Sequence, residues 1–116
     1  MGSRISGVCI DTNDVGRATA FWSGMTGYKV EAAADEDATL AAPDGHGPGL
    51  FLQRVPEARS GKNRLHLDLA TSDVPAEVNR AIELGATEVK SFLDAAGSGW
   101  VVLADPDGNQ FCICAE

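Results

Sequence analysis

A few residues capable of ligand or acid–base chemistry stand out along this chain. His66 and Cys112 carry an imidazole and a thiol, which bind transition metals and which also act together as base and nucleophile in thiol enzymes. Asp11 and Asp68 supply carboxylates that would serve acid–base catalysis if they lay close together, and Gln53 adds a neutral oxygen donor. These residue types are compatible with metal binding, thiol catalysis or acid–base catalysis.

An internal repeat relates several of these residues. Residues 8–15 match residues 67–74 in apolar and polar character at an offset of 59 positions, and residues 51–53 match residues 110–112 at the same offset. A repeat of this length usually marks one supersecondary unit used twice, because one unit alone cannot cover its apolar face.

The same offset relates the candidate ligands to one another. It makes Gly7 the equivalent of His66, and Gln53 the equivalent of Cys112. The second half therefore carries the stronger donors, and the first half carries glycine and a neutral amide at the matching positions.

Length and composition predict one globular domain. A chain of 116 residues can bury one core, which the two halves should share as modules of about residues 1–58 and 59–116. The apolar runs are far shorter than a membrane span, and the first four residues do not resemble a signal peptide. We therefore expect a cytoplasmic protein that does not bind membranes.

Charge and cysteine content narrow the function further. The formal net charge of -8 disfavours nucleic-acid binding, which needs clustered Lys and Arg. Cys9, Cys112 and Cys114 form an odd set without CxxC spacing, which predicts reduced thiols.

The apolar periodicity predicts the order strand, helix, strand, strand, strand in each half. Asp14 is the expected N-cap of the first helix and Gly27 its C-terminal stop, whereas Ser72 or Asp73 caps the second helix and Gly85 ends it. The expected strands are residues 4–11, 28–33, 38–42 and 49–54, then 64–70, 88–94, 99–104 and 110–114. The fold class is α+β, with two βαβββ modules.

Strand alternation then assigns the two faces of each sheet. The side expected to pack under the helices carries an apolar set: Val8, Ile10, Leu50, Leu52, Leu65, Leu67, Leu69, Phe111 and Ile113. The opposite side is half polar: Gly7, Cys9, Asp11, Phe51, Gln53, His66, Asp68, Gln110, Cys112 and Cys114. A large sheet face without an apolar set favours a ligand cleft over a dry core.

The chain resembles the vicinal oxygen chelate superfamily, the group that includes glyoxalase I, extradiol dioxygenases, and the fosfomycin- and bleomycin-resistance proteins. The resemblance rests on the paired modules and on short motifs at residues 13–15, 21–22, 53–57, 63–69 and 105–109. It implies two modules whose curled sheets surround a cleft, commonly in a homodimer.

Metal-dependent members of that superfamily take ligands from the first and fourth strands of each module. The resemblance places Gly7, Gln53, His66 and Cys112 at those positions, and of these only His66 is a strong ligand in the family's usual sense. Manganese, magnesium and iron prefer oxygen-rich sets, so a soft and incomplete set disfavours a divalent metal. We therefore predict a site without metal, with mixed-ligand zinc as the alternative.

Several alternatives remain open at single residues. Cys112 is a small buried hydrophobe or a nucleophile beside His66, and His66 is a neutral cleft histidine or a ligand. Asp68 is one half of an acid–base pair with Asp11 or an anchor at a strand end. Trp100 stacks on a planar ligand or closes one end of the sheet, whereas Trp22 belongs to the core.

The sequence therefore predicts a small-molecule-binding protein that resembles the drug-sequestering resistance proteins. The alternative is a glyoxalase- or dioxygenase-like enzyme, a lyase or oxidoreductase with a non-standard metal or thiol–histidine site. The predicted ligand site comprises Gly7, Cys9, Asp11, Phe51, Gln53, His66, Asp68, Trp100 and Cys112. A homodimer is expected because a symmetric partner would cover exposed sheet edges.

Overall fold

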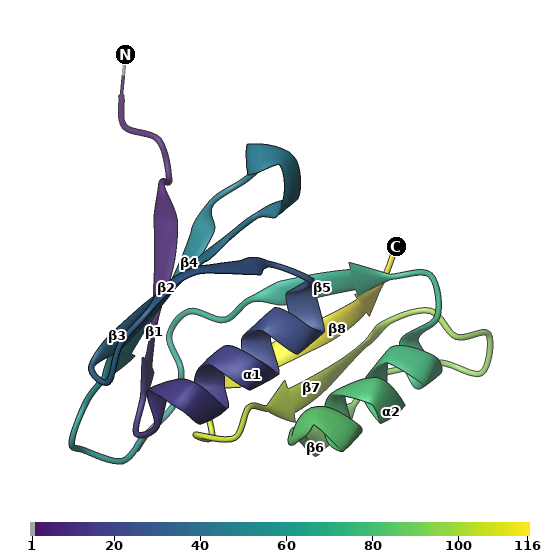
Figure 1. Ribbon diagram of the computed structural model, residues 1–116. Coiled ribbons are helices and arrows are strands. Elements are labelled where there is room, and N and C mark those ends of the chain that lie inside the picture. Colours follow the sequence, from purple (N-terminus) through teal and green to yellow (C-terminus); the bar gives the residue numbers. More distant parts are fainter. Residues whose placement is uncertain (1) are drawn as a thin grey trace. The chain divides into compact units, whose positions relative to one another are not determined.

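Two compact units of the same architecture make up the chain. The computed structural model describes residues 2–116; the first unit (unit 1) ends at Ala58 and the second (unit 2) begins at Arg59. Each unit contains one four-stranded mixed sheet and one long helix (Figure 1). The predicted α+β class and the βαβββ order of each half are confirmed.

In unit 1 the strand order across the sheet is β1-β4-β3-β2. β1 runs parallel to β4, and the other neighbours are antiparallel. A parallel pair needs a crossover connection, to which α1 contributes. The elements are β1 (Gly7–Thr12), α1 (Val15–Thr26), β2 (Lys29–Ala33), β3 (Asp37–Ala41), a short 3-10 turn (Pro43–Gly45) and β4 (Gly49–Arg54).

Unit 2 repeats this plan with the order β5-β8-β7-β6, in which β5 is parallel to β8. The elements are β5 (Asp68–Thr71), α2 (Val74–Leu84), β6 (Thr87–Ser91), β7 (Trp100–Ala104) and β8 (Gln110–Ala115). None of the described helices has the length and apolar character needed to cross a membrane.

The helix boundaries follow from their caps, as predicted. Asp14 Oδ1 accepts a hydrogen bond from the Arg17 amide at 3.0 Å, and Asp73 Oδ1 accepts one from the Ala76 amide at 3.1 Å. These bonds satisfy amide groups that the first helical turn leaves without partners. Gly27 follows α1 with a φ of 74°, a left-handed conformation that favours glycine and ends the helix.

Two strands begin later than predicted. The sequence predicts strands over residues 4–11 and 64–70, but β1 begins at Gly7 and β5 begins at Asp68. The side-chain amide of Asn63 lies 3.4 Å from the carbonyl oxygens of both Leu65 and Gln110. The Asn63 side chain therefore approaches carbonyl oxygens that a longer β5–β8 ladder would use. The β5–β8 pairing instead begins with the hydrogen bond from the Cys112 amide to the Leu67 carbonyl at 2.9 Å.

The core is heavier under α1 than under α2. Phe21 and Trp22 are each 1 % exposed, and their rings meet edge to face with centroids 5.1 Å apart. The buried residues of α2 are smaller: Val74, Val78 and Ala81. The predicted burial of Trp22 is confirmed.

The predicted apolar sheet set is correct in part. Ile10, Leu50, Leu52, Phe111 and Ile113 are buried. Val8, Leu67 and Leu69 are only half-buried, and Leu65 is 88 % exposed, so its predicted burial is wrong. Leu65 precedes β5, where the chain is not yet held in the ladder that would direct its side chain toward α2.

Candidate functional site

The chemistry of unit 2 gathers on the sheet face opposite α2. Phe111 and Ile113 of β8 belong to the buried core, so the alternating residues Cys112 and Cys114 project to the other face. The ladders pair Cys112 with Asp68 on one side and with Val102 on the other. Because paired residues point the same way, this face carries Asp68, Cys112, Cys114, Val102 and Trp100.

One end of this face is polar. His66 Nε2 lies 3.2 Å from Asp68 Oδ1, and both side chains are exposed, by 51 % and 64 % respectively. One donor atom each of His66, Asp68 and Cys112 lies within 4.8 Å of the other two. Cys112 is buried. We call these three residues the polar triad.

The polar triad keeps its thiol protonated. Burial raises the pKa of Cys112 first, and the negative charge of Asp68, the neighbouring Cys114 and a hydrogen bond with Asp68 raise it further. A nucleophilic cysteine needs the opposite shift, toward thiolate. His66 contacts Asp68, and the hydrogen bond of the thiol is also with Asp68, so the thiol-nucleophile alternative loses support.

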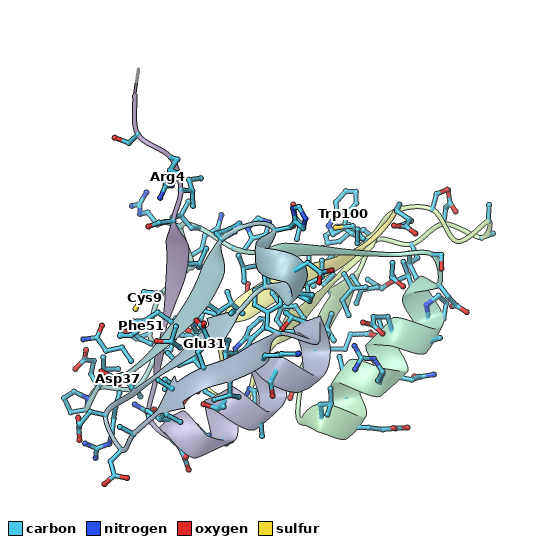
Figure 2. The ribbon with its side chains drawn as sticks, turned by 45° about the horizontal axis from the view of Figure 1, so that its top comes forward. Arg4, Cys9, Glu31, Asp37, Phe51 and Trp100 are labelled. Atoms are coloured by element: carbon cyan, nitrogen blue, oxygen red, sulfur yellow. The ribbon has the colours of Figure 1, made fainter. Side chains whose placement is uncertain are left out.

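The other end of the face is aromatic. The rings of Phe92 and Trp100 stack with centroids 5.0 Å apart and planes 22° apart, and the Lys90 ammonium lies 4.9 Å from the Phe92 centroid. Phe92 and Trp100 are 43 % and 44 % exposed, and Figure 2 shows Trp100 standing clear of the ribbon. We call Phe92 and Trp100 the aromatic ledge.

Sequence reasoning missed Phe92 as a candidate site residue. Phe92 follows β6, and its amide donates to the Trp100 carbonyl at 2.8 Å, which fixes the two residues side by side. The available signal was the pair of aromatic residues that flank the glycine-containing turn, in a chain with only seven aromatic residues (Phe 4, Trp 2, Tyr 1).

Unit 1 places its predicted site residues on the corresponding face of its own sheet. The β1–β4 ladder pairs Cys9 with Phe51 and Asp11 with Gln53. Cys9 Sγ donates to Gln53 Oε1 at 3.6 Å, and Figure 2 shows Cys9 and Phe51 close together. Burial, followed by the charge of Asp11, raises the pKa of the Cys9 thiol. This face therefore presents neutral groups beside Asp11, and the β3–β4 ladder adds Asp37 next to Gln53.

The ladders correct one equivalence of the repeat. Asp68 pairs with Cys112, and its repeat partner Cys9 pairs with Phe51. Phe51, not Gln53, is therefore the unit 1 equivalent of Cys112. Loops of different length leave a net shift of two residues between the last strands, and a two-residue shift preserves the face on which each side chain lies.

This correction bears on the metal positions implied by the resemblance. In unit 1 the equivalents of His66 and Cys112 are Gly7 and Phe51, neither of which has a side-chain donor. These two positions of unit 1 therefore offer a metal ion no side-chain ligand. The polar triad of unit 2 alone is a mixed nitrogen, oxygen and sulfur set, which zinc tolerates.

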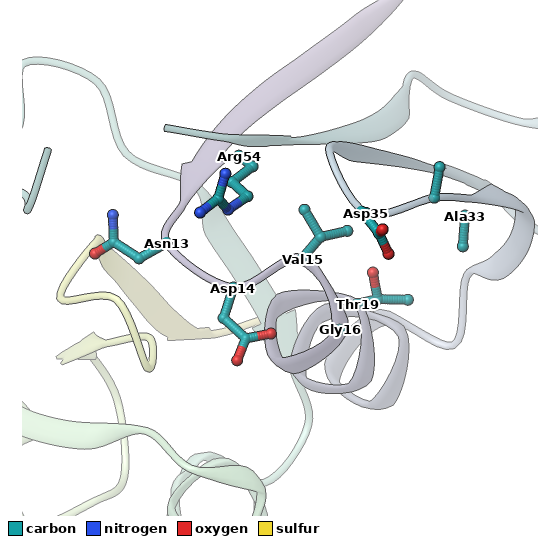
Figure 3. Close-up of a pocket in the computed structure, with 9 residues that line it drawn as sticks. Asn13, Asp14, Val15, Gly16, Thr19, Ala33, Asp35 and Arg54 are labelled. Carbon is teal, nitrogen blue, oxygen red and sulfur yellow. The ribbon is translucent and has the colours of Figure 1, made fainter. Parts of the chain in front are cut away.

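A separate hollow of about 500 Å³ lies in unit 1, at the N-terminal end of α1 (Figure 3). It contains the hydroxyl of Thr19, which is buried without a hydrogen-bond partner in the described part of the chain. None of the predicted site residues lines it; its lining is Asn13, Asp14, Val15, Gly16, Thr19, Ala33, Ala34, Asp35 and Arg54.

Comparison with known proteins identifies a family. The model of the glyoxalase-like domain matches residues 7–114. No curated protein matches the chain.

Solved structures share the fold at low sequence identity. A glyoxalase/bleomycin resistance protein/dioxygenase family enzyme from Burkholderia phytofirmans is 20 % identical, with a TM-score of 0.78 over 97 % of this chain and 98 % of that chain. A mutant of the fosfomycin resistance protein FosX from Listeria monocytogenes, in complex with Mn(II) and 1S,2S-dihydroxypropylphosphonic acid, is 15 % identical, with a TM-score of 0.77 over 98 % and 90 %. TioX from Micromonospora sp. ML1 is 17 % identical, with a TM-score of 0.62 over 97 % and 98 %.

Proposed function

The chain belongs to the glyoxalase-like domain family, and on that premise we propose that it binds a small organic molecule without the manganese-type ion of its metal-dependent structural relatives. The single observation that carries the proposal is the face of unit 2 opposite α2. It combines an exposed aromatic ledge with a polar triad, the mixture of apolar surface and few polar groups that is typical of ligand sites.

The lack of a side-chain donor at Gly7 and Phe51 supports binding without a hard metal ion. The FosX structure contains Mn(II), whereas Gly7 and Phe51 leave half of the implied ligand positions of this chain without a donor. Of the remaining positions, Cys112 supplies sulfur, which manganese does not favour. The bound molecule would be held by stacking on the aromatic ledge and by hydrogen bonds to the polar triad, in the manner of a sequestering protein.

A thermal-shift screen tests this proposal. Protein in chelator is incubated with a panel of planar, partly apolar molecules, because a ligand that binds only the native state raises the melting temperature. We expect at least one such molecule to raise it, and manganese or iron, each added alone to protein without chelator, to leave it unchanged. A stabilising effect of manganese that His66→Ala removes would contradict the proposal.

The proposal includes a two-fold homodimer. β2 and β6 each end their sheet, and all five residues of each strand are exposed. Such edges are commonly covered by a partner. Light scattering should give the mass of two chains at high protein concentration, and the mass of one chain would remove this part of the proposal.

The contact between His66 and Asp68 favours one second candidate, an enzyme of the lyase or oxidoreductase class that uses His66 as an acid–base group or as a ligand of a non-standard metal site. His66 and Asp68 lie within hydrogen-bond distance, the arrangement in which a carboxylate orients an imidazole for proton transfer. Turnover of hemithioacetal or catechol substrates that His66→Ala abolishes would support this candidate. Equal rates with wild-type protein and His66→Ala would exclude a catalytic role for His66.

A further inference from the structure

The polar triad also has the donor atoms of a metal site, which binding of an organic molecule alone does not require. Its three residues come from the segment that leads into β5, from β5 itself and from β8, so unit 2 supplies all of them. Unit 1 does not repeat this set: its equivalents of His66, Asp68 and Cys112 are Gly7, Cys9 and Phe51. Any cation bound here would depend on one unit only.

The distances within the polar triad suit a small tetrahedral ion. With zinc bond lengths of about 2.0 to 2.3 Å, neighbouring ligand atoms in a tetrahedral site lie about 3.4 to 3.6 Å apart. His66 Nε2 and Asp68 Oδ1 are already 3.2 Å apart, and no donor pair of the triad exceeds 4.8 Å. The remaining contraction is about 1 Å at most, and the exposed side chains of His66 and Asp68 can make it by rotating about their χ angles.

The donor types select among metal ions. A thiolate is a soft ligand that favours zinc and its tetrahedral substitute cobalt over manganese and magnesium, which prefer carboxylate, carbonyl and water oxygens. One imidazole, one carboxylate and one thiolate make three protein ligands, the number that leaves the fourth position of a zinc site open.

We propose that unit 2 alone binds one thiophilic divalent cation of the zinc and cobalt class through His66 Nε2, an Asp68 carboxylate oxygen and Cys112 Sγ. Binding exchanges the thiol proton for the metal ion and releases that proton to solvent. Asp68 is the distinctive residue of this site. It supplies a ligand from unit 2 itself, whereas Gly7 and Phe51 of unit 1 supply none. With three protein ligands, the fourth position would be open to water or to a donor atom of the organic ligand.

Cobalt titration tests this proposal directly, because a cobalt–thiolate bond produces a near-ultraviolet charge-transfer band that oxygen and nitrogen ligands do not. Reduced protein is titrated with cobalt chloride. We expect the band to saturate at one equivalent per chain and to disappear when zinc is added. Zinc should also raise the melting temperature, whereas manganese at the same concentration should not.

Variants assign the ligands. Cys112→Ser should abolish the band, and His66→Ala and Asp68→Asn should each weaken cobalt binding by at least about tenfold, since even residues that only support metal ligands cost that much when removed. The matched controls are Cys114→Ser, which changes the next thiol on the same face of β8, and Cys9→Ser, which changes the thiol of unit 1. Both should bind cobalt like the wild type, and circular dichroism without metal checks that each variant is folded.

Three results would overturn the proposal: no charge-transfer band at saturating cobalt, a band that survives Cys112→Ser, or an unchanged affinity in Asp68→Asn. These results are separable from failure of the proposed function, because the organic-ligand screen is performed in chelator. A protein that binds organic ligands but no cobalt would retain the proposed function and lose this inference.

Discussion

Unit 1 buries the large side chains Phe21, Trp22 and Met25 on α1, whereas unit 2 buries only Val74, Val78 and Ala81 on α2. On the opposite sheet faces the contrast is reversed. Unit 1 presents a thiol bonded to an amide, the carboxylates of Asp11 and Asp37, and Phe51 without a second ring, whereas unit 2 presents the polar triad and the aromatic ledge. Two copies of one architecture have thus diverged in opposite directions on their two faces.

The comparison shows how a repeated fold can separate stability from chemistry. Both units have the same strand order, and an aspartate caps the helix of each. The architecture therefore does not determine which unit carries the reactive groups. The difference comes from single positions: Phe21 corresponds to Arg80, Trp22 to Ala81, and Gly7 to His66. We infer that unit 1 contributes mainly packing energy and that unit 2 contributes the binding site.

The largest expected effect is on stability, in the core of unit 1. Phe21→Ala should lower the free energy of unfolding by about 3 to 5 kcal/mol, because it removes a fully buried ring and leaves a cavity. In unit 2, Val78→Ala removes two methyl groups from the buried face of α2 and should cost about 2 kcal/mol. Urea denaturation measures both values, and equal costs would break the proposed division of roles.

The second effect is on ligand affinity. Trp100→Ala should weaken binding of a planar molecule by about 1 kcal/mol, or roughly fivefold, because the exposed ring of the ledge is lost. Phe51→Ala, the exposed aromatic residue of the unit 1 face, should leave the affinity unchanged. Isothermal titration calorimetry compares the two. A larger loss in Phe51→Ala would move the site to unit 1.

The third effect is on thiol reactivity and its pH dependence. Because burial and Asp68 raise the pKa of Cys112, its thiol is protonated at neutral pH, and alkylation in chelator should be slower in folded protein than in urea. The rate should rise as the pH approaches and exceeds the usual thiol range. Asp68→Asn should accelerate alkylation only in part, since burial is the larger cause. Mass spectrometry of iodoacetamide-treated protein follows Cys112 separately from Cys9, and rapid alkylation at neutral pH would contradict this account.

The smallest effect is on a surface ion pair of α2. Arg80 Nη2 lies 2.7 Å from Glu77 Oε2, and hydrogen bonding to Arg80 lowers the pKa of Glu77. A lowered carboxyl pKa stabilises the folded state above the unfolded-state pKa, and the stabilisation is lost as the pH falls through the folded-state value. Glu77→Gln should therefore cost about 0.3 to 0.5 kcal/mol at pH 7 and less in acid. A cost that does not depend on pH would show that the pair contributes nothing.

Local chemistry made much of the fold predictable from the sequence. Asp14, Gly27, Asp73 and Gly85 mark the helix boundaries by their own capping and turn properties, so no tertiary information was needed. Strand alternation likewise separated Phe111 and Ile113 from Cys112, because the side-chain period of a strand is two residues.

The errors arose where distant residues decide the outcome. The start of β5 depends on the Asn63 amide meeting the Gln110 carbonyl, 47 positions away, which no local pattern records. The equivalence of Cys112 and Phe51 depends on loop lengths summed over half the chain. The contact between Phe92 and Trp100 depends on the pairing of β6 and β7. The contact between His66 and Asp68 depends on the direction of the His66 side chain just before β5.

The claim that unit 2 binds the ligand can be tested most directly by tryptophan fluorescence. The protein has two tryptophans, Trp22 buried at 1 % exposure in unit 1 and Trp100 exposed at 44 % in unit 2, so each reports on one unit. A planar ligand from the screen is titrated in chelator against wild-type protein, Trp100→Phe and Trp22→Phe. We predict that quenching is lost in Trp100→Phe and retained in Trp22→Phe. Quenching that persists in Trp100→Phe and is lost in Trp22→Phe would place the ligand near unit 1 and contradict the account.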